Sequence, residues 1–195
     1  ELKNALIHMR YDVSTRDAIE LLERNMFVYS RPRRSARVAS MTRYSIRQVF
    51  DMRAMLSGLA ARYATRNATP ADMAEMRARL AILAGLHRRD PEGADAIYAQ
   101  NYRLWLKLHE AARARNISFI TASVSGAGIW QLALRDRLSA GDQTLSGREL
   151  IEDWEAMLTA IEARDEAEAE RLANHISDIG WRMVEHVLPP DADGP

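Results

Sequence analysis

The stretch VSTRDAIELLERNMFVYSRPRRSARVA, residues 13–39, decides the fold of the first part of the chain. Ile19, Leu22 and Met26 recur at spacings of three and four, which predicts an amphipathic helix with one apolar face. The apolar pair at 27–28 then begins a strand, residues 31–35 turn the chain, and residues 36–39 return with alternating character. The pattern therefore predicts a helix followed directly by a two-stranded ribbon.

The tip of this ribbon is strongly basic. It carries Arg31, Arg33, Arg34 and Arg37, whose like charges repel one another unless phosphates neutralise them. Guanidinium groups also suit phosphate oxygens and guanine edges. A solvated basic hairpin would carry the same residues, so the ribbon alone leaves both interpretations open. The preceding helix favours a DNA-binding module.

Length and composition limit the class of protein. A chain of 195 residues can hold one large domain and a small one, and its 47% of hydrophobic residues can form a core. The chain has no cysteine, which excludes disulfides and thiol catalysis. The sequence shows no run of apolar residues long enough to span a membrane and no signal peptide. We therefore expect a cytoplasmic protein without a membrane partner.

Charge is distributed unevenly along the chain. The whole sequence has 27 basic and 27 acidic residues, but residues 1–48 hold ten of the basic and five of the acidic ones. The remainder holds 17 and 22. A basic head on an acidic body is typical of a DNA-binding module joined to a dimerisation or small-molecule module.

The chain from residue 43 onward is helical in pattern. We expect helices over residues 43–66, 70–87, 94–115, 147–164 and 165–188, and a kinked or broken helix over 117–138. Thr69 and Pro70 mark a helix start, and residues 140–147 form the most flexible connection. The apolar face expected on the first of these helices is Ile46, Val49, Phe50, Met52, Met55, Leu56, Leu59 and Tyr63. Six helices with short connections predict a bundle.

The first 40 residues resemble the second half of the winged helix-turn-helix of GntR-type bacterial transcription regulators. The matching residues are Ala5, Leu6, Val13, Ser14, Arg16, Ile19, Leu22, Pro32, Arg33, Arg34, Ser35 and Val38. The family usually has about three more residues after the Val-Ser pair, glycine at the place of Ser35, and a preceding helix, so we expect a longer native chain. The resemblance implies that Ser14, Thr15, Arg16 and the four ribbon arginines contact DNA.

The helical part resembles the FCD ligand-binding domain that follows such heads in the FadR subfamily. Trp154, Asp165 and His175 match the last two helices of that domain, and Arg53 matches its first helix. Asn101 and Trp105 stand where the family carries aspartate and histidine. The resemblance implies a mainly helical protein with a head over residues 1–40, an effector-binding and dimerisation domain over 43–188, and a tail over 189–195.

The resemblance also implies a metal site, which this chain does not preserve. Metal-binding relatives supply one carboxylate and three imidazoles, and this chain offers only Asn101 and His175 at those positions. Tryptophan cannot ligate an ion, so Trp105 and Trp154 remove two donors. We predict no tightly bound metal and no other cofactor, with at most a weak divalent ion at His175.

Two interpretations of the pocket stay open. Trp105 and Trp154 either fill the former metal site or stack on an effector whose polar end reaches Asn101, His175 or Arg53. His175 fits a hydrogen-bonded core histidine as well as a ligand contact. Arg53 fits a buried ion pair with Asp153 or Asp178 as well as an effector contact.

The sequence predicts a transcription regulator that binds a palindromic operator in double-stranded DNA as a homodimer and senses a small molecule, such as an organic acid. The alternatives are a ligand-independent dimeric regulator with a filled pocket and a helical protein-interaction module. An enzyme using His175 with Asp153 or Glu155 is disfavoured, because the chain has no nucleophile motif and no phosphate loop.

Overall fold

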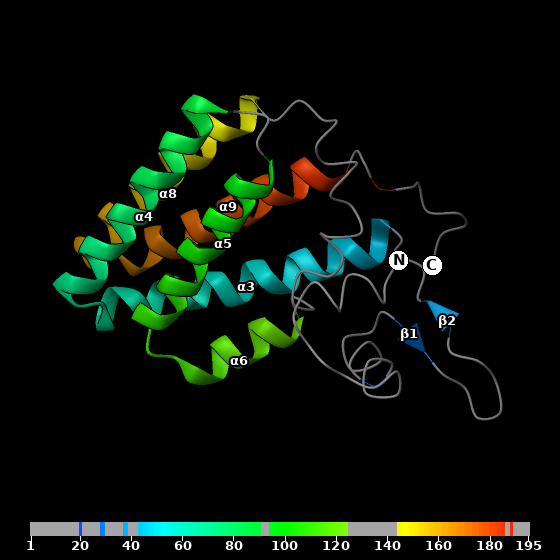
Figure 1. The fold of residues 1–195 in the computed structure, drawn as a ribbon. Helices are drawn as coiled ribbons and strands as arrows, with labels where there is room; N and C mark the ends of the chain where they lie inside the picture. The colour runs from blue at the N-terminus through cyan, green and yellow to red at the C-terminus, as the bar shows by residue number, and fades with distance from the viewer. Residues whose placement is uncertain are drawn as a thin grey trace.

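The structure, a computed structural model, describes Glu20 and residues 28–29, 37–38, 43–90, 94–124, 144–185 and 188. In these residues it is an all-helical bundle accompanied by one short two-stranded ribbon (Figure 1). The helices are α3 (Arg43–Asn67), α4 (Pro70–Arg89), α5 (Ala94–Ala111), α6 (Arg115–Val124), α8 (Thr144–Glu162) and α9 (Glu166–Glu185). The predicted fold class, mainly helical with a bundle of helices from residue 43 onward, is confirmed.

The predicted ribbon is present as two strands, β1 (Val28–Tyr29) and β2 (Arg37–Val38). They pair antiparallel, with Val28 opposite Val38 and Tyr29 opposite Arg37. Glu20, within the expected recognition helix, is helical. The other predicted DNA contacts lie outside the described residues; they are Ser14, Thr15, Arg16, Arg31, Arg33 and Arg34.

The start of α4 follows the sequence signal closely. Thr69 is the N-cap, and its hydroxyl accepts a hydrogen bond from the backbone N–H of Asp72 at 3.2 Å. The Asp72 carboxylate in turn accepts from the Thr69 backbone N–H at 2.9 Å, which completes a capping box. Pro70 occupies the first turn, where its missing N–H costs nothing.

The helices pack around α3, whose most extensive partner is α9 (Figure 1). Their close approach depends on small residues: a Cβ at Gly58 would lie 2.7 Å from Asn174 Oδ1. α9 also packs on α8, and α4 packs on both α5 and α8, whereas α6 lies against α3 on the side away from α4 and α8. The largest fully buried side chains are Trp154, Met76, Leu83, Leu104, Leu108, Met157, Leu158, Ile161 and Ile179.

The apolar face predicted for α3 is partly wrong. Ile46 and Phe50 are buried as expected, but Met52, Met55 and Tyr63 are 38%, 74% and 39% exposed. The buried face of α3 instead continues through small residues, namely Ser57, Gly58, Ala60, Ala61 and Ala64. The prediction was based on the large apolar residues, but a helix that approaches its neighbour closely needs small residues at the contact.

The third predicted helix, 94–115, is in fact two elements. α5 ends at Ala111, and Arg113 has a left-handed φ of 54° before α6 begins at Arg115. The Arg113 backbone N–H bonds to Glu110 O at 3.0 Å, and its guanidinium reaches Ala111 O at 3.0 Å. No glycine or proline in the sequence indicates this break. Hydrogen bonds of the Arg113 side chain stabilise a backbone conformation that arginine rarely adopts.

The remaining boundaries differ by smaller amounts. α8 begins at Thr144, inside the connection predicted over residues 140–147. Of the kinked helix predicted over 117–138, the structure describes α6 only, and the expected break at 125–128 and the tail at 189–195 lie outside the described residues.

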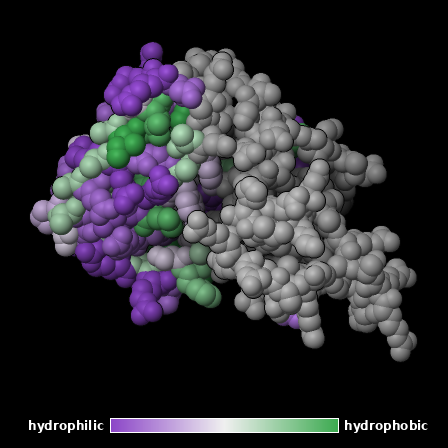
Figure 2. All heavy atoms as spheres, in the orientation of Figure 1, coloured by the Kyte–Doolittle hydropathy of each residue, from purple (hydrophilic) through white to green (hydrophobic). Residues whose placement is uncertain are grey.

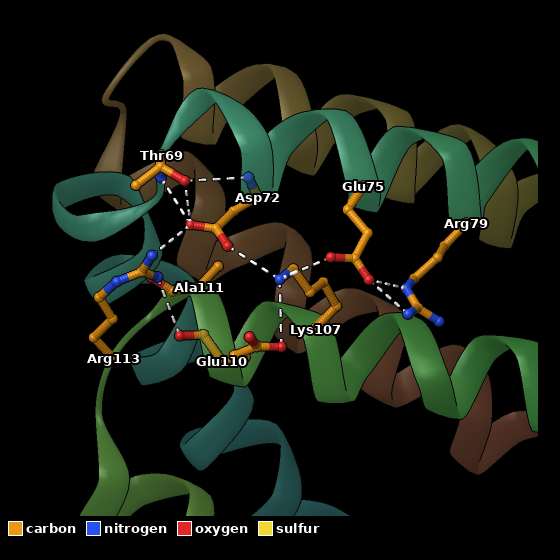
Figure 3. A network of polar contacts seen from close by, with 8 residues as sticks. All are labelled: Thr69, Asp72, Glu75, Arg79, Lys107, Glu110, Ala111 and Arg113. Atoms are coloured by element: carbon orange, nitrogen blue, oxygen red, sulfur yellow. Dashed lines mark hydrogen bonds and ion pairs between the residues drawn. The ribbon is translucent and has the colours of Figure 1, made fainter.

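A buried charged network joins α4 to α5 (Figure 3). The Lys107 side chain is only 8% exposed, and its Nζ lies 3.1 Å from Asp72 Oδ1, 2.9 Å from Glu75 Oε2 and 3.3 Å from Glu110 Oε2. The guanidinium of Arg113 donates to the other oxygen of Asp72 at 2.7 Å. The same cations thus stabilise the capping box of α4 and the turn after α5.

The surface of the described part is largely hydrophilic. In Figure 2 apolar residues form separate patches, one of them over α6. The most exposed large apolar side chains lie on α3, α4, α5 and α6, and include Met55, Ile82, Leu106 and Phe119. Among the described residues, no helix has the length and apolar character that a membrane span requires.

Candidate functional site

A pair of indoles packed between α5 and α8 forms the first part of the candidate site. Trp154 is fully buried, and its Nε1 donates a hydrogen bond to Asn101 Oδ1 at 3.0 Å. Trp105 meets the Trp154 ring edge-on, with centroids 4.7 Å apart and an interplanar angle of 62°. Three residues selected from the sequence therefore lie together, and the polar end of the buried indole is satisfied within the protein.

The structure brings His175, on α9, together with two carboxylates of α8. Its Nδ1 lies 2.7 Å from Asp153 Oδ2, and its Nε2 lies 3.6 Å from Glu149 Oε1. Glu149 also accepts a hydrogen bond from the Arg182 guanidinium at 2.8 Å. Glu149 was not selected from the sequence, although its spacing of four from Asp153 places both carboxylates on one face of α8.

Arg53, on α3, carries a positive charge that has no carboxylate partner among the described residues. The alternative of an ion pair with Asp153 or Asp178 is wrong, because Asp153 bonds to His175 and Asp178 accepts from Arg47 at 3.4 Å. The guanidinium carbon of Arg53 lies 5.6 Å from the centroid of the Phe50 ring.

The surroundings of Arg53 disfavour the charged form of its side chain. Burial lowers the pKa of Arg53, and the neighbouring phenols of Tyr98 and Tyr102 act weakly in the opposite direction. A cation removed from water is costly unless an anion or hydrogen-bond acceptors compensate it. Arg53 is thus a half-buried cation of α3 that no carboxylate of the described residues pairs with.

His109, on α5, is a second unsatisfied group in the same region. It is 7% exposed, and its Nδ1 is buried without a hydrogen-bond partner within the part of the chain that the structure describes. Burial and, to a smaller extent, the Arg53 charge lower the pKa of His109 to about 4. The imidazole is therefore neutral at physiological pH and has one N–H to donate.

Four aromatic residues of α5 share one face of the helix. Tyr98, Tyr102, Trp105 and His109 follow one another at spacings of four, three and four, which place them on one stripe. The rings of Tyr98 and Tyr102 stack with centroids 6.5 Å apart. Only Trp105 of this stripe was selected from the sequence; the helical spacing was the signal that could have revealed the others.

Comparison with known proteins identifies the helical part. Residues 48–178, more than half of the chain, match the FCD domain. The chain belongs to the FCD domain family. The resemblance to FadR-type GntR regulators with an FCD domain is thus confirmed, and the chain is a transcription regulator with an effector-binding domain. This family is regulatory rather than enzymatic.

Solved structures support the same fold for the FCD domain protein. E. coli McbR/YncC matches with a TM-score of 0.72 and 18% sequence identity, over 88% of this chain and 83% of that chain. No curated protein matches the sequence.

The side chains at the positions where the resemblance implies a metal site bond to one another. Asn101 Oδ1 already accepts the Trp154 hydrogen bond, and neither indole offers a lone pair for an ion. The cluster of Glu149, Asp153 and His175 has its ligand atoms within 4.8 Å of one another. The two carboxylates nevertheless face different nitrogens of the imidazole, and Arg182 supplies the charge that a metal would bring to Glu149.

Proposed function

We propose that this FCD-domain regulator binds a palindromic operator as a homodimer through its N-terminal head, and that its helical domain senses a small organic acid without a tightly bound metal. The observation that supports the sensing proposal is the half-buried guanidinium of Arg53 within the matched domain, which has no carboxylate partner among the described residues. The antiparallel pair of β1 and β2 and the arginines between the strands support the DNA-binding proposal. The protein acts in the cytoplasm, where its operator lies.

The DNA-binding proposal predicts a strong dependence of operator affinity on salt. Replacing both Arg33 and Arg34 with alanine should weaken binding to the upstream region of the protein's own operon. It should also reduce the slope of log affinity against log salt by about 0.9 for each phosphate that the variant no longer neutralises. Gel-shift titrations of the full chain between low and moderate salt measure both quantities.

A matched control uses a second pair of adjacent arginines. Arg88 and Arg89 are exposed near the end of α4, so their double alanine variant should leave affinity and salt slope unchanged. Equal losses of affinity in the two double variants would show a non-specific charge effect. An interaction module would show no salt-dependent operator binding in any variant.

The absence of a tightly bound metal is a second expectation. Titration of the chelator-treated protein with zinc or nickel should give no tight, stoichiometric calorimetric signal, because Trp105 and Trp154 replace two imidazoles. His175→Ala should therefore change the isotherm little. A stoichiometric signal that this substitution abolishes would show that the cluster with Glu149 and Asp153 is a metal site after all.

A ligand-independent regulator is the alternative function. The hydrogen bond from Trp154 to Asn101 and the edge-on contact of Trp105 favour it, since they fill the position that an ion occupies in relatives. It predicts that no small acid changes the affinity of the protein for its operator.

A further inference from the structure

The central helix α3 exposes an apolar stripe. Met52, Met55 and Tyr63 are 38%, 74% and 39% exposed, and Leu59 between them is partly buried. Their spacings of three, four and four residues place all four side chains on one side of the helix. Single exposed apolar residues need no explanation, whereas an apolar stripe along a helix marks a contact surface.

The neighbours of α3 within the chain leave this stripe uncovered. α3 contacts α5, α6, α8 and α9, with α9 along one side and α6 along another (Figure 1). These helices bury Ile46, Phe50 and Ala61, yet Met55 stays in water. The stripe is therefore a face of the central helix that the bundle itself does not use.

The charged residues beside the stripe are paired within the chain. Arg62 Nε lies 3.3 Å from Glu170 Oε2, and the Arg66 guanidinium donates to Glu166 at 2.7 Å. A second surface of the same composition can approach such a stripe, because neither side brings an unpaired like charge to the other. A strongly charged partner, by contrast, would meet an apolar centre and arginines that already have carboxylates.

We propose that a second copy of this chain covers the stripe, with the two α3 helices packed antiparallel about a two-fold axis near Met55. This inference rests on the proposed function, which requires a homodimer, and it names the surface through which the two copies meet. In a two-fold interface the same patch of both copies meets itself, so an apolar stripe is complementary to its own image. Met52, Met55 and Leu59 have the spacing of three and four with which paired helices interlock.

The position of Met55 along α3 fits the spacing of operator half-sites. Met55 lies 12 residues after Arg43, where α3 begins, which is about 18 Å along the helix axis. In an antiparallel pair centred on Met55 the two helix starts are therefore about 36 Å apart. Heads in neighbouring major grooves on one face of DNA are about 34–36 Å apart. Because α3 begins shortly after β2, this pairing holds two heads at the separation of one turn of DNA.

The surface around the stripe is large enough for a stable dimer. α3 has 25 residues and is about 37 Å long. A strip of that length and two helix diameters wide, which includes the adjoining edges of α6 and α9, covers about 800 Å². Each partner of a standard protein interface buries about the same area. The apolar centre and the polar edges of the strip match the usual division of an interface into core and rim.

Sedimentation equilibrium of the full chain tests the proposed interface. The native chain should be a dimer at micromolar concentration. Met55→Glu, which brings two carboxylates together at the two-fold axis, should weaken dimerisation by about 30-fold or more, as is typical of a residue at the centre of an interface. Ile82→Glu is the matched control, because Ile82 is 56% exposed on α4, outside the stripe, and it should leave the dimer unchanged. Circular dichroism confirms that both variants fold.

The chain has no cysteine, which allows a second and direct measurement. Helix axes 8–10 Å apart place the Cα atoms of two facing residues about 5 Å from each other, within the range that a disulfide bridges. Met55→Cys should therefore form covalent dimers under mild oxidation, whereas Ile82→Cys should run as a monomer on a non-reducing gel.

The outcomes separate this inference from the proposed function. A dimer that Met55→Glu leaves intact and that Met55→Cys does not cross-link overturns the inference, and retained operator binding then leaves the regulator proposal standing. A chain that is monomeric both free and on its operator overturns the inference and contradicts the homodimer of the proposed function as well. A dimer that depends on Met55 but binds no operator supports the interface and contradicts the DNA-binding proposal.

Discussion

Replacing Trp154 with alanine is expected to lower the free energy of unfolding by about 3–5 kcal/mol, the range for truncating a buried aromatic side chain. The residue is fully buried between α5 and α8, so its loss leaves a cavity beside Trp105. The substitution also removes the donor to Asn101 Oδ1, which leaves a polar group without its partner. Urea unfolding followed by circular dichroism measures the change.

A second substitution separates volume from hydrogen bonding. Trp154→Phe keeps an aromatic ring but loses the Nε1 donor, so it should cost clearly less than Trp154→Ala. If the alanine variant lost less than about 1 kcal/mol, well below the range for a buried aromatic residue, the indole could not be the side chain that fills the predicted pocket. That result would favour the interpretation in which the indole stacks on an effector.

Replacing Lys107 with methionine should also destabilise the protein strongly, by about 3–5 kcal/mol, as is typical when one partner of a buried ion pair is removed. The substitution preserves much of the side-chain volume but leaves Asp72 and Glu75 without their shared cation. Arg113 still bonds to Asp72, so the loss should fall in the lower part of that range.

Arg171→Met is the control for Lys107→Met. Arg171 pairs with Glu168 on the exposed face of α9, and exposed pairs contribute little to stability because water screens them. Comparable losses of stability in the two variants would show that the network in Figure 3 adds nothing beyond an ordinary surface pair.

The pH dependence of the Lys107 effect has a defined sign. Hydrogen bonds from Thr69, assisted by Lys107 and Arg113, hold the pKa of Asp72 well below its usual 3.8, so its contribution is present above that value and is lost in stronger acid. The bond to Glu75, followed by those to Asp72 and Glu110, raises the pKa of Lys107 above its usual 10.5, so its contribution is present below that value and is lost in stronger base. The difference in free energy of unfolding between the native protein and Lys107→Met should therefore be largest at pH values between these two pKa values, and it should become smaller in acid.

Local signals in the sequence predicted most of the helical architecture. Thr69, Pro70 and Asp72 define the start of α4 by short-range hydrogen bonding, and such contacts can be read from neighbouring residues. The break after Ala111 could not be read in this way. It depends on Arg113 reaching Asp72, 41 residues away along the chain, a contact that exists only when α4 and α5 are already packed.

The sequence predicted the part of the candidate site whose residues match positions of the family. Asn101, Trp105 and Trp154 lie together in the structure, as the resemblance to the family led us to expect. His109 was missed because nothing in a sequence shows that a buried nitrogen lacks a partner. Arg53 was selected, but the fact that no carboxylate of the described residues pairs with it is a property of the packed helices.

The short connection between the ribbon and the bundle sets a limit on the geometry of a dimer. Only residues 39–42 separate the end of β2 at Val38 from the start of α3 at Arg43. Fully extended, that tether reaches at most about 18 Å. In a homodimer each ribbon would therefore stay close to the first turn of its own α3, and the tolerated gap between operator half-sites would be set by the distance between those two turns.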